Sequence, residues 1–294
     1  MHSRIEADTV TQMPPDEGFL LLGHELRIKI LWALWTAPNQ TTTFSELQER
    51  LDIEDNGRLN YHRDKLTDHF IKPATDEEGY TLRQAGRGVV RAIHAGTYTA
   101  HGELEPIPIE GQCADCSGTL AFRYVDNMAN VFCMDCEKLW DEYAFPPGGL
   151  VDRNGDALAH AAEQRVRVEL TLARRGVCPE CAGQMTAALV PGSSEYFNHP
   201  VHVRYECQHC TFHPRQSLGE AVLDHPAVVA FFYEHGADVR EIPRWQLPFC
   251  YDRNYIEKVS DDPLRGAVVV TFEGKRLRAT LGADGTPIQF ERES

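Results

Sequence analysis

The chain has 294 residues, 42% of them hydrophobic, which is enough for about two to four domains. It contains no apolar run long enough to cross a membrane. The formal net charge is −15, from 44 acidic and 29 basic residues. Residues 1–17 are polar and carry acids, which predicts a short flexible tail rather than a signal peptide. We therefore expect a cytoplasmic protein.

The charge is unevenly distributed along the chain. Residues 18–96 hold ten Lys/Arg and eleven Asp/Glu, whereas the rest of the chain holds 19 basic and 33 acidic residues. A nearly neutral segment within an acidic chain is the place where an anionic partner can dock.

Residues 18–98 predict a small helical domain with one hairpin. Leu22, Leu26 and Ile30 recur at helical spacing, and Thr43 with Glu46 forms a capping-box pattern. The predicted elements are helices over 19–35, 44–51 and 58–70, a hairpin over 71–82 and a helix over 84–96.

Two stretches of this segment resemble a known family. Residues 22–31 read Leu-Gly-His-Glu-Leu-Arg-Ile-Lys-Ile-Leu, and residues 59–66 read Leu-Asn-Tyr-His-Arg-Asp-Lys-Leu. They resemble the opening pattern and the recognition helix of ArsR-like winged helix-turn-helix regulators. The acid-rich composition with only six lysines, together with the cysteine pairs that follow, resembles a haloarchaeal member of that class.

The resemblance implies that residues 18–98 bind double-stranded DNA and that the protein is a homodimer. The outward side of the third helix would supply donors to base edges and phosphates from the major groove. The residues implied are Arg58, Asn60, Tyr61, Arg63 and Lys65. The hairpin tip carries Asp76, Glu77 and Glu78, which phosphates would repel, so we expect the tip to face solvent or a protein partner.

Eight of the nine cysteines form four C-x-x-C pairs. A C-x-x-C turn presents two thiolates to one metal, and two such turns close a tetrahedral shell with no open position for chemistry. The spacing therefore predicts two structural Zn²⁺ ions per chain. The simpler topology has each metal held by two successive pairs, and a topology in which the pairs interleave is the alternative. Redox disulfides in place of metal sites are a weaker alternative. The predicted ligands are Cys113, Cys116, Cys133 and Cys136, then Cys178, Cys181, Cys207 and Cys210.

The rest of the chain predicts an α+β arrangement of two ribbons and a C-terminal domain. Residues 97–112 hold glycines and prolines and are predicted as a linker. A first zinc ribbon is expected over 110–148, with strands over 120–125 and 130–132. The next part, over 149–216, is expected to contain a linking helix over 157–175, capped by Asp156, and a second ribbon with strands over 186–190 and 202–206. A C-terminal domain is expected over 217–294. That last domain is expected to hold a helix over 218–235 and an antiparallel meander over 267–272, 275–281 and 286–292.

Other chemistry is weakly indicated. His101 and Glu103 form an H-x-E before Cys113, as in zinc deaminases, but the residue before Cys113 is not proline and the spacing is too short. The histidines near the second ribbon are redundant beside four thiolates; they are His199, His202, His209 and His213. Cys250 lies in an apolar stretch and is expected to be buried and inert rather than a thiol sensor.

These observations predict a non-enzymatic, sequence-specific transcriptional regulator with structural zinc. The alternative is a polymerase-associated adaptor, because a winged helix followed by a zinc ribbon also resembles archaeal transcription factor E. In that case the same surfaces would bind a protein of the transcription machinery.

Overall fold

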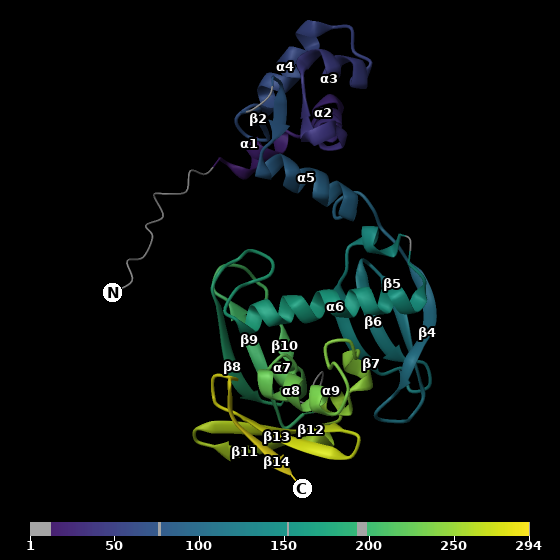
Figure 1. Cartoon of the computed structure of the whole chain (residues 1–294), viewed down its shortest axis with the longest axis vertical. Helices are drawn as coiled ribbons and strands as arrows, with labels where there is room; N and C mark the ends of the chain where they lie inside the picture. The colour runs from purple at the N-terminus through teal and green to yellow at the C-terminus, as the bar shows by residue number, and fades with distance from the viewer. Residues whose placement is uncertain (1–12, 76–77, 152, 193–198, 294) are drawn as a thin grey trace, which may run out of the picture. The chain divides into compact units, whose positions relative to one another are not determined.

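The computed structural model describes residues 13–75, 78–151, 153–192 and 199–293, and divides the chain into two units (Figure 1). Unit 1 extends to Ala100, and unit 2 begins at His101. The fold is mixed α+β, with four antiparallel sheets in the described residues. Among the described residues, unit 1 has one hydrophobic core and unit 2 has two, and each unit is described by itself.

Unit 1 packs its helices around a core that includes Ile30, Leu47 and Leu66, all fully buried. A small antiparallel sheet in the order β1-β3-β2 flanks this core. The elements are α1 (Pro15–Leu20), α2 (Glu25–Thr36), β1 (Thr41–Thr42), α3 (Phe44–Leu51), α4 (Asn56–Leu66), β2 (Ile71–Pro73), β3 (Tyr80–Leu82) and α5 (Gln84–Ala95).

The capping box predicted at Thr43 is confirmed, because its hydroxyl accepts from the Glu46 N–H and the Glu46 carboxylate accepts from the Thr43 N–H. The prediction of one continuous helix over 19–35 is wrong. It is interrupted before α2, where the extended residue His24 accepts the Leu26 N–H at Nδ1. The third helix begins earlier than expected because Asp55 caps it. It also ends earlier, at Leu66, because Thr67 is extended. Two acids of the predicted hairpin tip, Asp76 and Glu77, lie outside the described residues.

Unit 2 begins with an antiparallel sheet in the order β4-β5-β6-β7. Its strands are β4 (Leu104–Gln112), β5 (Thr119–Val125), β6 (Met128–Cys133) and β7 (Leu139–Ala144). The linker predicted over 97–112 is therefore wrong from Leu104 onward. Its prolines, Pro106 and Pro108, are tolerated because β4 is an edge strand with register shifts on either side of the pairs Ile107–Phe122 and Pro108–Ala121.

A 20-residue helix, α6 (Gly155–Arg174), follows the first sheet. Figure 1 shows it running across unit 2 from the β5–β6 end to the β8–β9 end. Its N-cap is Asn154, which accepts the Ala157 N–H at 3.0 Å, rather than the predicted Asp156. The predicted apolar stripe is confirmed, because Leu158, Ala162, Val166, Leu170 and Ala173 are all buried.

The second cysteine segment and the C-terminal segment share one hydrophobic core. The helix predicted over 218–235 is two helices, because Pro226 starts a new one after the His225 cap. The predicted meander gains a fourth strand, and the sheet order is β11-β12-β13-β14. The elements are β8 (Met185–Pro191), β9 (Val201–Cys207), β10 (Arg215–Gln216), α7 (Leu218–Val222), α8 (Pro226–Glu234), η4 (Arg244–Gln246), α9 (Pro248–Tyr251), β11 (Ile256–Asp261), β12 (Leu264–Phe272), β13 (Lys275–Leu281) and β14 (Pro287–Glu293).

Among the helices of the described residues, none combines the length and the apolar character needed to cross a membrane.

Candidate functional site

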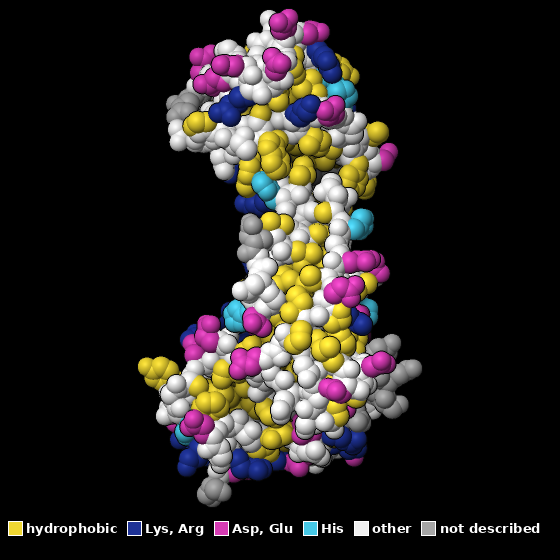
Figure 2. Space-filling view, turned by 90° about the vertical axis from the view of Figure 1, so that its right-hand side faces the viewer, with side chains coloured by type: hydrophobic (Ala, Val, Ile, Leu, Met, Phe, Trp, Pro, Cys, Tyr) yellow, Lys and Arg dark blue, Asp and Glu magenta, His cyan; other side chains and the backbone are white. Residues whose placement is uncertain are grey.

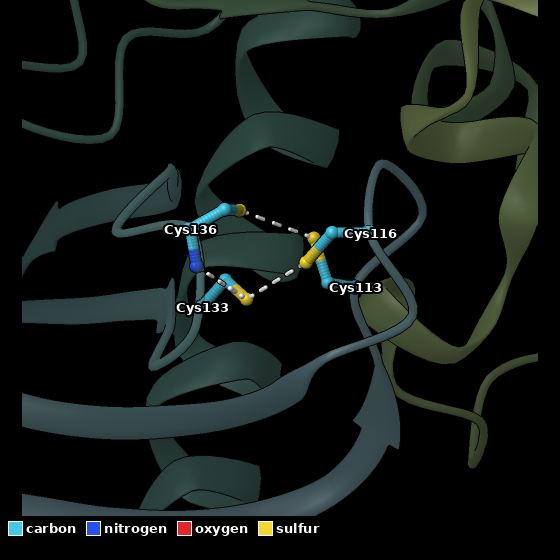
Figure 3. A group of neighbouring side chains, drawn as sticks. All are labelled: Cys113, Cys116, Cys133 and Cys136. Carbon is cyan, nitrogen blue, oxygen red and sulfur yellow. Dashed lines mark hydrogen bonds between the residues drawn. The ribbon is translucent and has the colours of Figure 1, made fainter.

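Two cysteine quartets converge in unit 2, and each is made of successive pairs. In the first, Cys113 follows β4 and Cys133 ends β6, while Cys116 and Cys136 lie in the turns after them. Figure 3 shows the four sulfur atoms facing one another from two loops. The second quartet is Cys178, Cys181, Cys207 and Cys210. The pairs therefore close locally and do not interleave.

The sulfur spacing fits a tetrahedral metal. A tetrahedron with metal–sulfur bonds of about 2.3 Å has sulfur–sulfur edges of about 3.8 Å. The sulfur–sulfur distances are 3.8 Å for Cys113–Cys136 and 3.5 Å for Cys116–Cys133. They are 3.7 Å for Cys178–Cys210 and 3.5 Å for Cys181–Cys207 in the second quartet. A disulfide needs about 2.05 Å, so both quartets have the geometry of a Cys₄ metal site.

The local sequence builds the turns that hold these thiols. After Cys113, the Ser117 N–H donates to the Cys113 carbonyl at 2.8 Å, and Ser117 takes a positive φ of 60°. Glu137 repeats this after Cys133, with an N–H bond of 3.0 Å and a φ of 59°. The two turns are joined by an ion pair of 2.6 Å between Lys138 and Asp115.

The second quartet uses the same turn and needs a glycine beside it. Ala182 takes a φ of 57° and donates to the Cys178 carbonyl at 2.9 Å. A Cβ on Gly183 would lie 3.1 Å from the Cys181 sulfur and 3.2 Å from the Cys207 sulfur. Any larger residue would therefore enter the space that the thiols and a metal share.

Backbone N–H groups favour a thiolate at one position of each quartet. Burial raises the pKa of Cys133, but the N–H groups of Cys136 and Asp135 outweigh it and bring that pKa to about 7. The Cys210 N–H is the main cause that lowers the pKa of Cys207 to about 6. Four thiols this close cannot all ionise without a cation, so a bound metal would supply the charge that lets the remaining thiols deprotonate.

The family comparisons follow the division into units. A family model described as a domain of unknown function, DUF7351, matches residues 110–286, which is more than half of the chain. The chain belongs to the DUF7351 family. A second model, also a domain of unknown function, DUF7347, matches residues 15–93 within unit 1. No curated protein and no solved structure matches the chain. Both cysteine quartets lie inside the DUF7351 region.

The other metal-ligand candidates stay outside these clusters. Among the described residues, the groups with metal-ligand spacing are the two quartets, and His101 and Glu103 belong to neither. His209 and His213 are exposed, whereas His199 and His202 are buried, and burial lowers the pKa of each buried imidazole to about 4. Cys250 is fully buried as expected, and burial raises the pKa of its thiol.

In unit 1, α4 separates the predicted DNA contacts from the core. Leu59, His62 and Leu66 are buried, whereas Arg58, Tyr61 and Lys65 are exposed. The Lys65 ammonium lies 5.8 Å from the centre of the Tyr61 ring, which is 59% exposed. These three side chains form the outward face of α4, and Asn60 is half-buried beside them.

Arg63 lies apart from that face. Its guanidinium lies 5.5 Å from the centre of the Phe44 ring and 5.0 Å from that of the Tyr80 ring. One of its nitrogens donates to the Tyr80 hydroxyl at 2.8 Å. Arg63 thus joins α4 to α3 and β3, and its side chain covers these rings while its guanidinium pairs with the Asp64 carboxylate at 2.5 Å.

A histidine pair connects α4 to the start of α2. The ring centres of His24 and His62 are 3.9 Å apart, and His62 is 7% exposed. Burial, with the nearby His24, Arg27 and Arg58, lowers the pKa of His62, so its neutral form is favoured in the fold.

A buried ion cluster, which the sequence did not reveal, ties the DUF7351 region together. Arg244 in η4 is 2% exposed and pairs with Asp141 of β7 at 2.5 Å, with Glu163 of α6 at 3.4 Å and with Glu220 of α7. Arg167 pairs with Glu163 at 2.7 Å. This Arg244 cluster joins three parts of unit 2: the β4–β7 sheet through Asp141, α6 through Glu163, and the C-terminal segment through Glu220 and Arg244.

A faint signal of this cluster exists in the sequence. Glu163 and Arg167 are four residues apart and flank the apolar stripe of α6, where a charged pair is unexpected. Their partners lie far away in sequence at Asp141, Glu220 and Arg244, and no local pattern indicates which charges would meet. Burial raises the pKa of both Asp141 and Glu220, and Arg244 opposes that shift in each case.

Proposed function

We propose that the protein is a sequence-specific DNA-binding transcriptional regulator, in which unit 1 is a winged helix-turn-helix domain of ArsR-like type. In this proposal α3 and α4 are the helix-turn-helix, β2 and β3 are the wing, and α4 enters the major groove. The order of these elements along the chain supports the assignment.

The outward face of α4 is the observation that carries the proposal. Leu59 and Leu66 are fully buried, and this fixes the helix so that Arg58, Tyr61 and Lys65 face outward together. Arginine and lysine donate to guanine edges or phosphates, and tyrosine can donate to a phosphate or pack on a base. A set of donors held on a packed helix is what base readout requires.

We further propose that both quartets hold Zn²⁺ as structural ions. The four-thiolate donor set and the sulfur spacing of 3.5–3.8 Å support this metal. The zinc would supply charge neutralisation and crosslinking of two turns, and its closed shell would leave no position for a substrate. The residues that would hold it are the eight paired cysteines.

The experiment is selection of duplexes from a random pool by the purified full chain, followed by affinity measurement on the selected sequence at one fixed salt concentration. Arg58→Ala and Tyr61→Ala should each weaken binding about 5- to 150-fold, because one good base contact contributes about 1–3 kcal/mol. Arg91→Ala, an exposed change on α5, is the matched control. Unchanged affinity in both α4 variants would refute the proposal.

A second candidate, a polymerase-associated adaptor, is favoured by the charge alone. Residues 18–96 carry ten basic and eleven acidic residues, a net charge of −1, and the whole chain has a net charge of −15. Figure 2 shows acidic and basic side chains interspersed over the face that it presents, so phosphate attraction over this face would be weak. Failure of the selection, together with binding to purified transcription machinery that Arg58→Ala reduces, would favour this candidate.

A further inference from the structure

Two imidazole rings meet where the start of α2 packs against α4. His24 precedes α2 and caps it, because its Nδ1 accepts the Leu26 N–H at 3.1 Å. The centre of the His62 ring, on the buried side of α4, lies 3.9 Å from that of the His24 ring, and the two planes are inclined by 34°. These two residues are the His24–His62 pair. Arg58 lies one helical turn before His62, and the Tyr61 ring centre is 5.1 Å from that of His62, so the pair supports the part of α4 that carries the proposed base contacts.

The contacts of both rings suit the neutral form of imidazole. A protonated imidazole carries hydrogen on both nitrogens and accepts no hydrogen bond. A proton on Nδ1 of His24 would therefore end its bond from the Leu26 N–H and remove the cap of α2. His62 is 7% exposed, and its buried Nδ1 has no hydrogen-bond partner among the described residues. A charged His62 ring would thus bury an N–H group that has no acceptor.

The charged groups around His62 also oppose its protonation. Burial is the main cause that lowers the pKa of His62, and the nearby His24, Arg27 of α2 and Arg58 of α4 lower it further. These causes include no carboxylate. Protonation of His62 would therefore place a positive charge among other positive or protonatable groups.

Glu25, in the first turn of α2, is the acid beside this contact. Its main partner is Lys29, at 2.6 Å, and it is attracted more weakly to His24 and Arg58. Glu25 is exposed, and solvent and salt screen exposed charges. It therefore compensates little for a charge on the buried ring, and acid favours separation of the two rings.

We propose that the His24–His62 pair is a pH-sensitive switch that holds α4 in its DNA-reading position only while both rings are neutral. Protonation removes the cap of α2 or places a charge within the contact, and α4 then loosens from α2. His24 and His62 are positioning residues, because they act on DNA through Arg58 and Tyr61 rather than by contact. The inference rests on the proposed function and adds regulation by pH to it.

The test is the affinity of the full chain for its selected duplex, at one salt concentration, from about pH 8 to about pH 5.5. His24→Asn keeps a capping side chain that does not titrate, and His62→Phe keeps an aromatic ring without the charge. The affinity of each variant relative to wild type should rise about 2- to 30-fold as pH falls, which is the range of equilibrium constants that one helix cap controls.

His69→Asn is the matched control, because His69 is an exposed imidazole just after α4. A charge on His69 attracts phosphate, so its removal should leave the affinity ratio constant or lower it in acid. Circular dichroism at about pH 8 would show that each variant keeps its helix content. Parallel pH profiles of affinity for the wild type, His24→Asn and His62→Phe would overturn the inference while the proposed function stands.

A second measurement needs no DNA. In NMR spectra of the wild-type chain, the His62 ring and the Leu26 amide should change together as pH falls. The Leu26 amide should not titrate in His24→Asn, and in His62→Phe its midpoint should move to higher pH, because the opposing charge is gone. A Leu26 amide that does not titrate in the wild type, or whose midpoint His62→Phe leaves unchanged, would overturn the inference. A chain that selects no duplex yet shows this joint titration would refute the proposed function and support the switch within unit 1.

Discussion

Replacement of Arg244 by methionine should destabilise unit 2 severely. The guanidinium is 2% exposed and lies among three carboxylates, those of Asp141, Glu163 and Glu220. Methionine keeps much of the volume but removes the charge, so that Arg167 alone must balance the three acids. Removal of one partner from a buried ion pair costs about 3–5 kcal/mol. For a unit of this size each kcal/mol lowers the unfolding midpoint by about 2–4 °C, so the expected loss is roughly 6–20 °C.

The pH dependence follows from the direction of the pKa shifts. Burial raises the pKa values of Asp141 and Glu220 above their unfolded values. The stability that these groups contribute is therefore greatest at low pH and is lost as pH rises through the raised values. Arg244 opposes both shifts, and without it they should increase. The deficit of Arg244→Met should therefore grow as the pH rises and Asp141 and Glu220 lose their protons, and it should shrink as the pH falls.

Calorimetry of the full chain, with hydrogen exchange of the peptides that contain β7 and α6, measures this loss. Arg276→Met is the matched control, because Arg276 is 51% exposed in its 2.8 Å ion pair with Glu293. Such a surface pair contributes about 1 kcal/mol or less. If Arg244→Met lost no more stability than Arg276→Met, the Arg244 cluster would not be what joins the parts of unit 2.

Three further predictions test other parts of the chain. Cys133→Ser should release one of two bound metal ions and increase hydrogen exchange in β5–β7 while α2–α5 stay protected; elemental analysis that finds no metal in the wild type would contradict the metal assignment. Burial lowers the pKa of His62 below its usual 6.5, so the stability of unit 1 should fall as pH drops below about 6.5, and His62→Phe should reduce this dependence in urea titrations; an identical pH profile in the variant would exclude His62 as the cause. Gly86→Ala places a Cβ 2.3 Å from the Phe70 carbonyl oxygen and should lower the free energy of unfolding by about 1–3 kcal/mol. Gly88→Ala places a Cβ with nothing within 4 Å and should stabilise α5 by up to about 1 kcal/mol. Equal effects of the two changes in thermal unfolding would show that the contact at Gly86 is not tight.

Several elements were predictable because their signals are local. The capping box of Thr43 and Glu46 needs only residues three apart, and it stands as predicted. The buried stripe of α6 follows from helical periodicity, and both cysteine quartets follow from C-x-x-C spacing. In each case the interacting groups either lie a few residues apart in the sequence or belong to a rare residue type whose spacing can be recognised.

The errors arose where a local rule has two outcomes. Pro106 and Pro108 suggested a linker, yet proline is also accepted in an edge strand, and only pairing with β5 shows which applies. The apolar run over 218–235 fits one helix, but Pro226 after the His225 cap starts a second one. The single helix predicted over 19–35 is interrupted at His24, because His24 is extended and its ring caps the start of α2.

By itself the sequence determined the two cysteine quartets, the helical periodicity of α6 and the mixed α+β class, since these depend on spacing and on residue chemistry. Only the tertiary structure decided that the second quartet and the C-terminal strands share one core, and that Arg244 meets Asp141, Glu163 and Glu220. Charges of opposite sign attract at any sequence separation. Their order along the chain therefore does not specify which of them meet, and packing of the sheets and helices makes that choice.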